Sequence, residues 1–434
     1  MATISRGLLD DFVLERAALT KSCKALAEEI LKSYEGDLDD YDALFDHCFA
    51  MLDEICLAAT DVAAVIEGEL YQAVYEYSNS EVFRPVYSSG YTSKSVEESL
   101  HAFLTIYSSN KNIDALSGKM AQRVGMEIDH AIAHCAIENE RLDKKKKKWA
   151  RIPSSVNPCK FCCMLASRGF EPGYNSYEAA RGKIGSHYGE CKCTIIQGYA
   201  GDDVEGYNPE AFYRQWQKLE KIDKREDLSQ DEKEVLRLVA ADSEQKFNLE
   251  QSKELAVKLG EVMSQRKDAF KDGGFTKEGY EKTVEAWIKD IGKLYGMDLS
   301  GEYLSGQKKR SAAPDGYELW AATRLRSRYK TMQFLGEDYS RTKGNPDLLI
   351  DGRYVEIKTP EIVGNIRDKV HEAYVQCINR GGKNALIILS PLRLEELDDR
   401  YIRFSYSTIR RKQKNGQDIS AIVIDGNLNL VDCP

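Results

Sequence analysis

The residues with the clearest capacity for chemistry are two carboxylates and a lysine in the C-terminal third of the chain: Asp347, Glu356 and Lys358. Between them, Asp351-Gly352 separates two short apolar runs, a pattern typical of a two-residue β-hairpin turn. With the turn at that position, Asp347 lies opposite Glu356. Lys358 shares their face, because side chains on a strand alternate between its two sides. We therefore expect all three side chains on one surface.

The expected pairing of Asp347 with Glu356 has an electrostatic cost, because two facing carboxylates repel each other across a hairpin. A divalent cation removes that repulsion, since hard cations take carboxylate oxygens as ligands and retain waters. Lys358 would then stabilise negative charge on a phosphate or orient an attacking water, so the pattern predicts a metal-dependent phosphodiesterase using Mg²⁺, Mn²⁺ or Zn²⁺. The structural alternative is an exposed Lys358–Glu356 ion pair, with Asp347 simply following a turn proline.

These residues also carry a family resemblance. Pro346-Asp347, followed nine residues later by Glu356-Ile357-Lys358, resembles the PD-(D/E)xK nuclease motif. The predicted order of elements also matches the core of that fold: a helix over 317–329, a strand over 331–335, the hairpin, a helix through 362–377 and a strand over 385–389. The resemblance implies Glu318 as an additional acid and Gln376 as an assisting polar residue.

Residues 312–434 as a whole look like the C-terminal nuclease toxins of contact-dependent growth inhibition proteins, several of which cleave transfer RNA. This resemblance implies a metal-dependent endoribonuclease acting on tRNA, and a cognate immunity protein in the producing cell. DNA remains an alternative substrate, because RNA and DNA present the same phosphates. A domain that only binds its target is the alternative from another functional class.

Charge is distributed unevenly along the chain. Residues 301–434 hold 22 Lys and Arg against 18 Asp and Glu, a net charge of +4, and the remaining 39 against 52 give residues 1–300 a net charge of −13. A mildly basic C-terminal part suits a nucleic-acid substrate. Within it, a strand over 401–409 is expected to lead into a basic turn that either contacts the nucleic-acid backbone or forms a solvated loop. Its cations are Arg410, Arg411, Lys412 and Lys414.

The first 150 residues show helical periodicity over four stretches: 8–31, 40–77, a run from an N-cap at Ser95, and 113–142. Helices this long favour an all-α packing unit. A run of five lysines, 144–148, precedes Pro153. We interpret this run as a junction between domains, with phosphate contact as the alternative.

Composition argues against two classes of protein. No apolar run approaches the roughly 18–20 residues of a membrane span. The first residues lack a basic region followed by an apolar core and a cleavage site, so no signal peptide is expected. The eleven cysteines are scattered and odd in number, unlike a secreted disulfide framework. They indicate a protein made in a reducing cytosol.

A cluster of cysteines and one histidine lies in an irregular segment over 157–199. Cysteine thiolates and imidazole at such spacing are the ligands of structural Zn²⁺ sites. The candidate ligands are Cys159, Cys162, His187 and Cys191, with Cys193 as the other option for the fourth position. Reduced cysteines that pack as small apolar side chains are the alternative, and a catalytic thiol is a third.

The same segment carries a second resemblance. Asn157-Pro158-Cys159-Lys160-Phe161-Cys162, followed by His187 and the Cys191-Lys192-Cys193 triplet, is similar to the core of phage minor head proteins of the Mu F-like head-morphogenesis type. That family has HxxCxC, whereas three residues here separate His187 from Cys191. The resemblance implies portal and capsid proteins as partners, assembly in the bacterial cytoplasm, and a place in the virion.

Together these patterns predict a multidomain fold. Residues 1–205 form a mostly helical head-protein region containing the Cys/His segment, and residues 206–311 form a charged helical spacer that ends in a linker. Residues 312–434 form a PD-(D/E)xK-like α/β nuclease domain. Some members of the Mu F-like family carry C-terminal toxin domains, which accounts for the combination.

Overall fold

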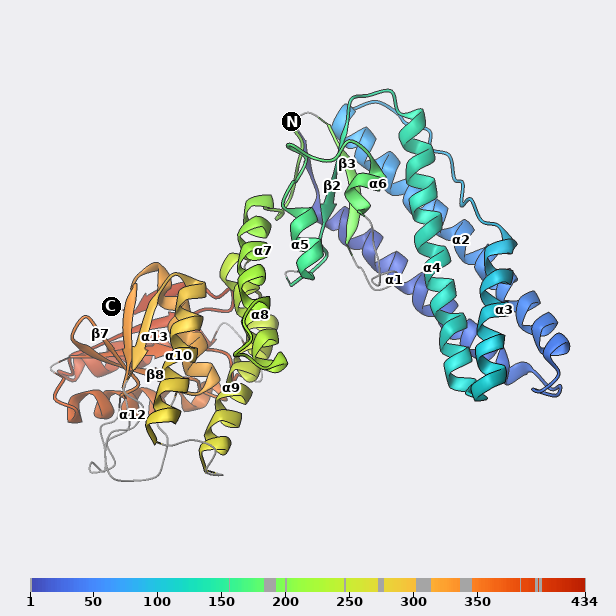
Figure 1. Cartoon of the computed structure of the whole chain (residues 1–434). Coiled ribbons are helices and arrows are strands. Elements are labelled where there is room, and N and C mark those ends of the chain that lie inside the picture. The colour runs from blue at the N-terminus through green and yellow to red at the C-terminus, as the bar shows by residue number, and fades with distance from the viewer. Residues whose placement is uncertain are drawn as a thin grey trace. The chain divides into compact units, whose positions relative to one another are not determined.

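The computed structural model describes residues 2–155, 157–182, 193–199, 201–245, 247–271, 277–301, 314–335, 346–382, 384–394, 397 and 400–433. Contacts divide the chain into two compact units, Met1–Trp216 and Gln217–Pro434 (Figure 1). Most of the predicted spacer, residues 206–311, thus belongs to the second unit and does not stand apart from it. The linker expected at its end lies outside the described residues.

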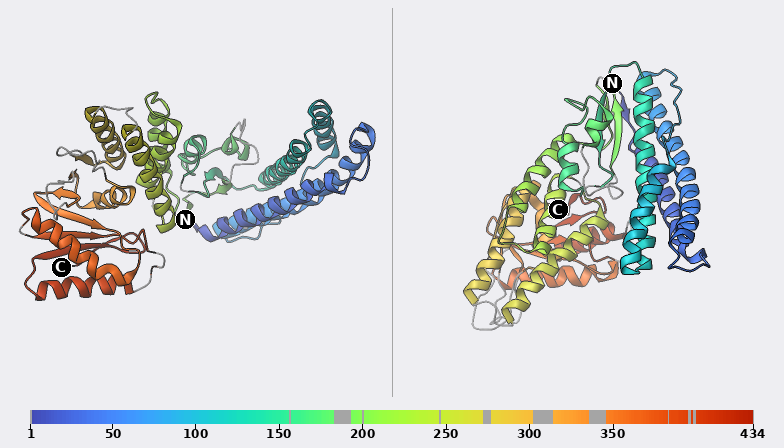
Figure 2. Two further views of the ribbon diagram at one scale, coloured as in Figure 1. Left: turned by 90° about the horizontal axis from the view of Figure 1, so that it is seen from below. Right: turned by 45° about the vertical axis from the view of Figure 1, so that its right-hand side comes forward.

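Four long helices make up most of the first unit: α1 (Arg6–Glu29), α2 (Tyr41–Asn79), α3 (Ser93–Asn110) and α4 (Ile113–Leu142). They confirm the four predicted helical runs, although α3 begins at Ser93 and places Ser95 inside its first turn. The helix α2 packs against the other three, and α1, α2 and α4 run side by side (Figure 2). Asp40 and Asn112 cap α2 and α4 by accepting backbone N–H bonds, which satisfies otherwise unpaired amides.

A small mixed layer completes the first unit. Strand β2 (Lys148–Ile152) pairs antiparallel with β3 (Thr194–Gly198), next to the short helices α5 (Lys160–Ala166) and α6 (Tyr177–Arg181). Strand β1 (Thr3–Ile4) pairs in parallel with β4 (Asp203–Val204). The fully buried Trp149 of β2 lies in a cluster of aromatic side chains with Tyr71 and Tyr177.

The five-lysine run lies inside this first unit, so its interpretation as a junction between domains is wrong. Lys145 pairs with Glu81 at 2.7 Å and Lys147 with Asp143 at 3.3 Å. Lys148 already belongs to β2. Two of the five lysines therefore pair with acidic side chains of the same unit.

A seven-stranded sheet forms the centre of the second unit, in the order β11-β10-β9-β8-β7-β6-β5. Strands β8, β9 and β10 are parallel, as are β5 and β6, and the remaining neighbours are antiparallel. The sheet consists of β5 (Asp298–Gly301), β6 (Thr331–Phe334), β7 (Leu348–Ile350), β8 (Arg353–Lys358), β9 (Ala385–Leu389), β10 (Ile419–Ile424) and β11 (Leu430–Cys433). Because β5 pairs with β6, the predicted spacer contributes an edge strand to this sheet.

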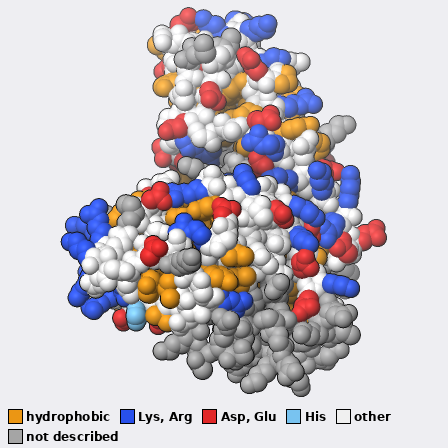
Figure 3. Space-filling model, turned by 90° about the vertical axis from the view of Figure 1, so that its left-hand side faces the viewer, with side chains coloured by type: hydrophobic (Ala, Val, Ile, Leu, Met, Phe, Trp, Pro, Cys, Tyr) orange, Lys and Arg blue, Asp and Glu red, His pale blue; other side chains and the backbone are white. Residues whose placement is uncertain are grey.

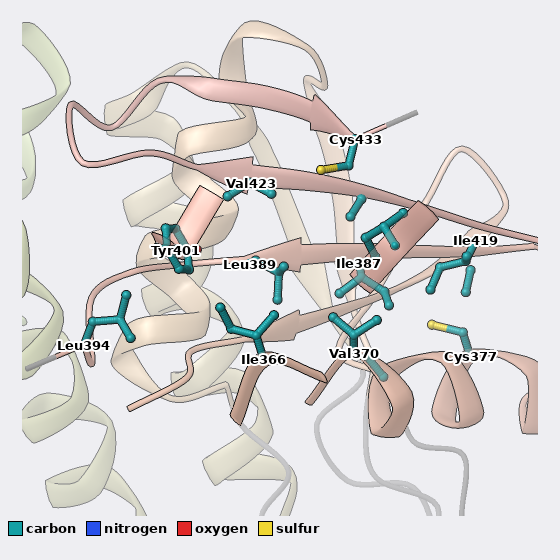
Figure 4. Close-up of a cluster of buried hydrophobic side chains, with 14 residues drawn as sticks. Ile366, Val370, Cys377, Ile387, Leu389, Leu394, Tyr401, Ile419, Val423 and Cys433 are labelled. Atoms are coloured by element: carbon teal, nitrogen blue, oxygen red, sulfur yellow. The ribbon is translucent and has the colours of Figure 1, made fainter. Parts of the chain in front are cut away.

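The second unit also contains helices. The first of them, α7 (Pro209–Asp223), contains the boundary between the two units. The others are α8 (Gln230–Glu244), α9 (Leu249–Lys271), α10 (Lys277–Tyr295), α11 (Gly316–Arg324), α12 (Ile366–Asn379) and α13 (Arg400–Lys414). Side chains of α12 and α13 bury one sheet face, where Val370 and Cys377 meet Ile387, Leu389 and Val423 (Figure 4).

The predicted strand over 401–409 and the basic turn after it are wrong, because the chain forms the single helix α13 there. Tyr401, Ser405 and Ile409 recur every four residues and are all buried. Side chains that recur with this period lie along one side of a helix, and that side can pack against a sheet. The competing period-two alternation of Ile402, Phe404 and Tyr406 misled the prediction.

None of the helices in the described part of the chain is long and apolar enough to cross a membrane. This agrees with the expectation from the sequence.

Candidate active site

The β7–β8 hairpin has the register that the sequence predicts, with Leu349 opposite Tyr354 and Ile350 opposite Arg353. The turn residues Asp351 and Gly352 have φ of +50° and +76°. Two consecutive positive φ values define the type I′ turn, whose twist matches that of paired strands. Continuing this register beyond the paired residues places Asp347 opposite Glu356.

The two carboxylates and the lysine come together at the end of this hairpin. The Oδ2 atom of Asp347 accepts a hydrogen bond from the backbone N–H of Ile357 at 2.7 Å. The ammonium of Lys358 forms an ion pair with Oε1 of Glu356. The side chains of Glu356 and Lys358 are only 1% and 17% exposed. The alternative of an exposed surface ion pair is therefore wrong, since this pair is buried.

Glu318 approaches the same site from the first turn of α11. Its Oε2 atom accepts the backbone N–H of Asp315 at 2.9 Å, and Asp315 Oδ1 accepts the backbone N–H of Glu318 at 2.8 Å. This reciprocal capping box fixes where the helix begins. The helix packs against α9, where any side chain at Gly316 would overlap the Ala256 carbonyl oxygen.

Each of these charged groups affects the pKa of at least one other, so they lie near one another. Burial raises the pKa of Asp347 and of Glu318 well above the ordinary range, and the next cause is Glu356 for Asp347 and Asp347 for Glu318. Burial also raises the pKa of Glu356 to about 7, against the opposing effect of Lys358. Burial disfavours the charged form of Lys358, but Glu356 and Asp347 together outweigh it and raise its pKa. The lysine is therefore charged at neutral pH.

The donor set suits a divalent cation. Glu356 Oε2 is buried and has no hydrogen-bond partner in the described part of the chain. With all three carboxyl groups ionised, they and the ammonium would carry a net charge of −2, which one divalent cation cancels. Within the described residues no three His, Cys, Asp or Glu side chains are grouped to hold a metal by themselves. A cation at Asp347 and Glu356 would thus take further ligands from water and substrate, as Mg²⁺ commonly does.

The raised pKa of Glu356 makes the stability of the second unit depend on pH. Its pKa is about 7 in the folded state against 4.5 ordinarily, so between these values the folded state keeps a proton that the unfolded state has lost. Stability therefore falls as the pH rises from about 4.5 to about 7, by about 3 kcal/mol from this group. We expect the melting temperature without divalent metal to fall over this range, and saturating Mg²⁺ to reverse most of the fall.

Thermal denaturation of the full chain with a chelator or with Mg²⁺ measures this effect, and Glu356→Gln serves as the control. Glutamine cannot titrate, so this variant should show a flatter pH profile and a weaker response to Mg²⁺. A melting temperature that rises with pH in the absence of metal would contradict the prediction.

Gln376 and the residues beside it lie on α12, which packs against β8 and β9. Gln376 is half-buried, and its role in the site stays a prediction. Its neighbour Cys377 is buried, and its raised pKa includes contributions from Glu356 and Asp347, which places this part of α12 near the carboxylates.

Sequence reasoning missed Asp315, although the spacing Asp315-x-x-Glu318 is a capping-box signal.

A pocket of about 610 Å³ lies beside the N-terminus of α11. Its one arginine, Arg393, forms an ion pair with Asp315 at 2.8 Å and stacks over the ring of Tyr317 at 4.4 Å. Among the described residues that line this pocket, Asp315 therefore neutralises the one arginine.

The predicted nucleic-acid contacts lie in the last turns of α13. Arg410, Arg411 and Lys414 are exposed there, and Lys412 is half-buried against α12. The basic segment is thus part of a helix with a defined orientation, and the alternative of a solvated loop is wrong. Its contact with nucleic acid stays a prediction.

The cysteine cluster is only partly described. Cys159 caps α5, where its Sγ atom accepts the backbone N–H of Cys162 at 3.4 Å. Burial raises the pKa of Cys163, and Cys159 and Cys193 add to that rise, which places these thiols close together. His187 and Cys191 lie outside the described residues, so the zinc ligand set stays a prediction.

Fold and site describe a protein of two parts, a helical first unit and a sheet-centred second unit with a buried carboxylate–lysine site. The model of the VG15 protein family matches residues 3–219, which is half of the chain and corresponds closely to the first unit. The chain therefore belongs to the VG15 protein family and is a viral, phage-type protein. No curated protein and no solved structure matches the chain.

Proposed function

We propose that the second unit is a metal-dependent endonuclease of the PD-(D/E)xK type and that its substrate is transfer RNA. The observation that carries this proposal is the grouping of Asp347, Glu356 and Lys358 at one end of a hairpin, with Glu318 coupled to them. The order from α11 through β6, the hairpin and α12 to β9 supports the same assignment.

Each residue has a distinct role in this proposal. Asp347 and Glu356 hold Mg²⁺ or Mn²⁺, or alternatively Zn²⁺, which when bound supplies Lewis-acid activation of the phosphate and a lowered pKa for water. Lys358 provides a fixed positive charge in a nearly dry site, where it stabilises the negative charge that develops on the phosphate. Glu318 is the additional acid: burial raises its pKa, which favours the protonated form that exchanges a proton with the reacting oxygens. Gln376 helps to position the phosphate.

For the whole chain we propose a phage minor head protein of the Mu F-like type that carries this nuclease as a toxin. Membership of the VG15 family supports a phage protein, and the spacing of Cys159 and Cys162 supports the finer assignment. Portal and capsid proteins are its partners during assembly in the bacterial cytoplasm and afterwards in the virion. An immunity protein binds the nuclease in the producing cell, and the cysteine cluster holds a structural Zn²⁺.

The proposal is tested by incubating the full chain with total transfer RNA and with plasmid DNA, in Mg²⁺, Mn²⁺ or Zn²⁺ and in a chelator. The full chain is required because β5 and α9 pack with the elements of the site, and a fragment starting near residue 312 would remove them. We expect tRNA cleavage that depends on metal. Cleavage of DNA alone would keep the mechanism and change the substrate. No cleavage of either would leave a structural head protein whose C-terminal unit only binds.

A further inference from the structure

Positive charge gathers on α12 and α13, two helices that pack against each other. Arg367 of α12 and the four cations of α13 form this surface, which we call the basic face: Arg367, Arg410, Arg411, Lys412 and Lys414. Lys and Arg side chains are concentrated at one side of the second unit, next to a histidine (Figure 3). The sequence places Arg367 more than forty residues from the other members, so only the fold brings them together.

Like charges lie close to each other on the basic face. The ammonium of Lys412 contacts Nδ1 of His371 at 2.9 Å. Burial lowers the pKa of Lys412, and Arg367 and Arg411 lower it further, whereas Asp368 acts in the opposite direction. The cations of α12 and α13 therefore repel one another, and a bound anion would relieve this repulsion.

The cations of the basic face form no ion pair with the acidic side chains that the structure describes, although Asp368 lies near enough to raise the pKa of Lys412. No Asp or Glu in the described part of the chain lies within ion-pair distance of any of its five cations. Several other cations of the second unit do have such partners; for example, Lys258 contacts Glu234 and Lys289 contacts Glu285, both at 2.5 Å. A cluster of cations that form no ion pairs with neighbouring carboxylates is typical of a surface that binds a polyanion.

We propose that the basic face binds the sugar–phosphate backbone of a folded RNA whose scissile bond lies in the candidate active site. The helix α12 connects the two places, because it carries Arg367 and packs against β8, the strand of Glu356 and Lys358. This inference rests on the proposed nuclease function. It adds the surface that holds the substrate, including Arg367.

An exposed aromatic side chain points to RNA with unpaired bases. Phe404 of α13 is 42% exposed and lies seven residues before Arg411. Two helical turns separate them, so both side chains lie on the same side of the helix. Aromatic side chains next to cations stack on unpaired bases while the cations hold phosphates. Such a surface favours the single-stranded loops of a folded RNA over a regular duplex.

The test measures binding separately from cleavage, with the full chain in a chelator so that no metal-dependent reaction occurs. Fluorescence anisotropy of a labelled transfer RNA, a DNA duplex of similar length and phosphatidylglycerol vesicles is followed over a series of salt concentrations. The variants are Arg411→Glu, Arg367→Glu and Phe404→Ala. Lys282→Glu is the matched control, because Lys282 is an exposed cation on α10 of the same unit.

Arg411→Glu and Arg367→Glu should each weaken tRNA binding at least about five-fold near 0.15 M salt, and should reduce the salt slope by about one. Phe404→Ala should weaken tRNA binding more than duplex binding. Lys282→Glu should change neither quantity by more than about two-fold. All four sites are on the surface, and unchanged circular dichroism verifies folding.

Equal effects of Arg411→Glu and Lys282→Glu would overturn the proposal, as would binding to vesicles but not to RNA. The cleavage assay separates this inference from the proposed function. If the wild-type chain binds tRNA through the basic face but cleaves nothing with any metal, the binding surface stands and the nuclease assignment fails. If variants with reversed charges on the basic face cleave tRNA as well as the wild-type chain does, the nuclease assignment stands and this inference fails.

Discussion

Replacing Asp347 or Lys358 by alanine is expected to reduce metal-dependent cleavage at least about a hundredfold. The two changes should act differently on cation binding. Asp347→Ala removes a metal ligand, so both Mn²⁺ binding and cleavage should be lost. Lys358→Ala removes only a positive charge from a site that already has an excess of carboxylates. It should retain Mn²⁺ binding and lose the stabilisation of the developing phosphate charge, an effect typically of 10²- to 10³-fold in rate.

Isothermal titration with Mn²⁺ and the tRNA cleavage assay, both on the full chain, measure these two effects. Glu361→Gln and Lys330→Ala are matched controls, because both side chains are exposed and lie a few residues from the site or from its neighbouring strand. They should retain activity within about two-fold. An active Lys358→Ala variant, or an Asp347→Ala variant that cleaves at the wild-type rate, would rule out the assigned roles.

Asp242→Ala is expected to lower the free energy of unfolding of the second unit by about 3–5 kcal/mol, the usual cost of breaking a buried ion pair. Asp242 of α8 is 0% exposed and pairs with Arg324 of α11 and with the hydroxyl of Tyr295 of α10. Burial lowers the pKa of Arg324 to about 9, which reflects how little water reaches the guanidinium. Without Asp242 this arginine would be buried without its carboxylate.

Chemical denaturation of the full chain measures this loss, and Glu234→Ala is the matched control on the same helix. Glu234 pairs with Lys258 but is 59% exposed, and surface ion pairs contribute about 0–1 kcal/mol. Because Arg324 and Glu318 share α11, the Asp242→Ala variant should also lose cleavage at temperatures where it remains largely folded. Similar losses of stability in the two variants would show that the Asp242 network is not a major support of the second unit.

The β7–β8 hairpin could be predicted almost completely from the sequence. Asp351-Gly352 determines the turn, the turn determines the register, and alternation then assigns Asp347, Glu356 and Lys358 to one face. Each step depends on residues only a few positions apart, where backbone conformation and side-chain direction are closely linked. The helices of the first unit were predictable for the same reason, since their apolar residues recur with the helical period over many turns.

Other features depended on contacts between distant segments. The alternation over 401–409 is compatible with a strand or a helix, and only burial of Tyr401, Ser405 and Ile409 against the sheet selects α13. The five-lysine run suggested a domain junction, but it lies within the first unit, where two of its lysines pair with Glu81 and Asp143. Local propensity is too weak to decide such cases when tertiary packing favours another outcome.

The sequence alone thus determined which side chains of the hairpin share a face, because that relation is local. It could only suggest that Glu318 joins them, because the position of α11 depends on the close contact of Gly316 with α9. The burial that raises the pKa of Glu356 to about 7 is likewise a property of the packed unit. Only the tertiary structure removes water from these carboxylates, and their raised pKa values follow from that exclusion.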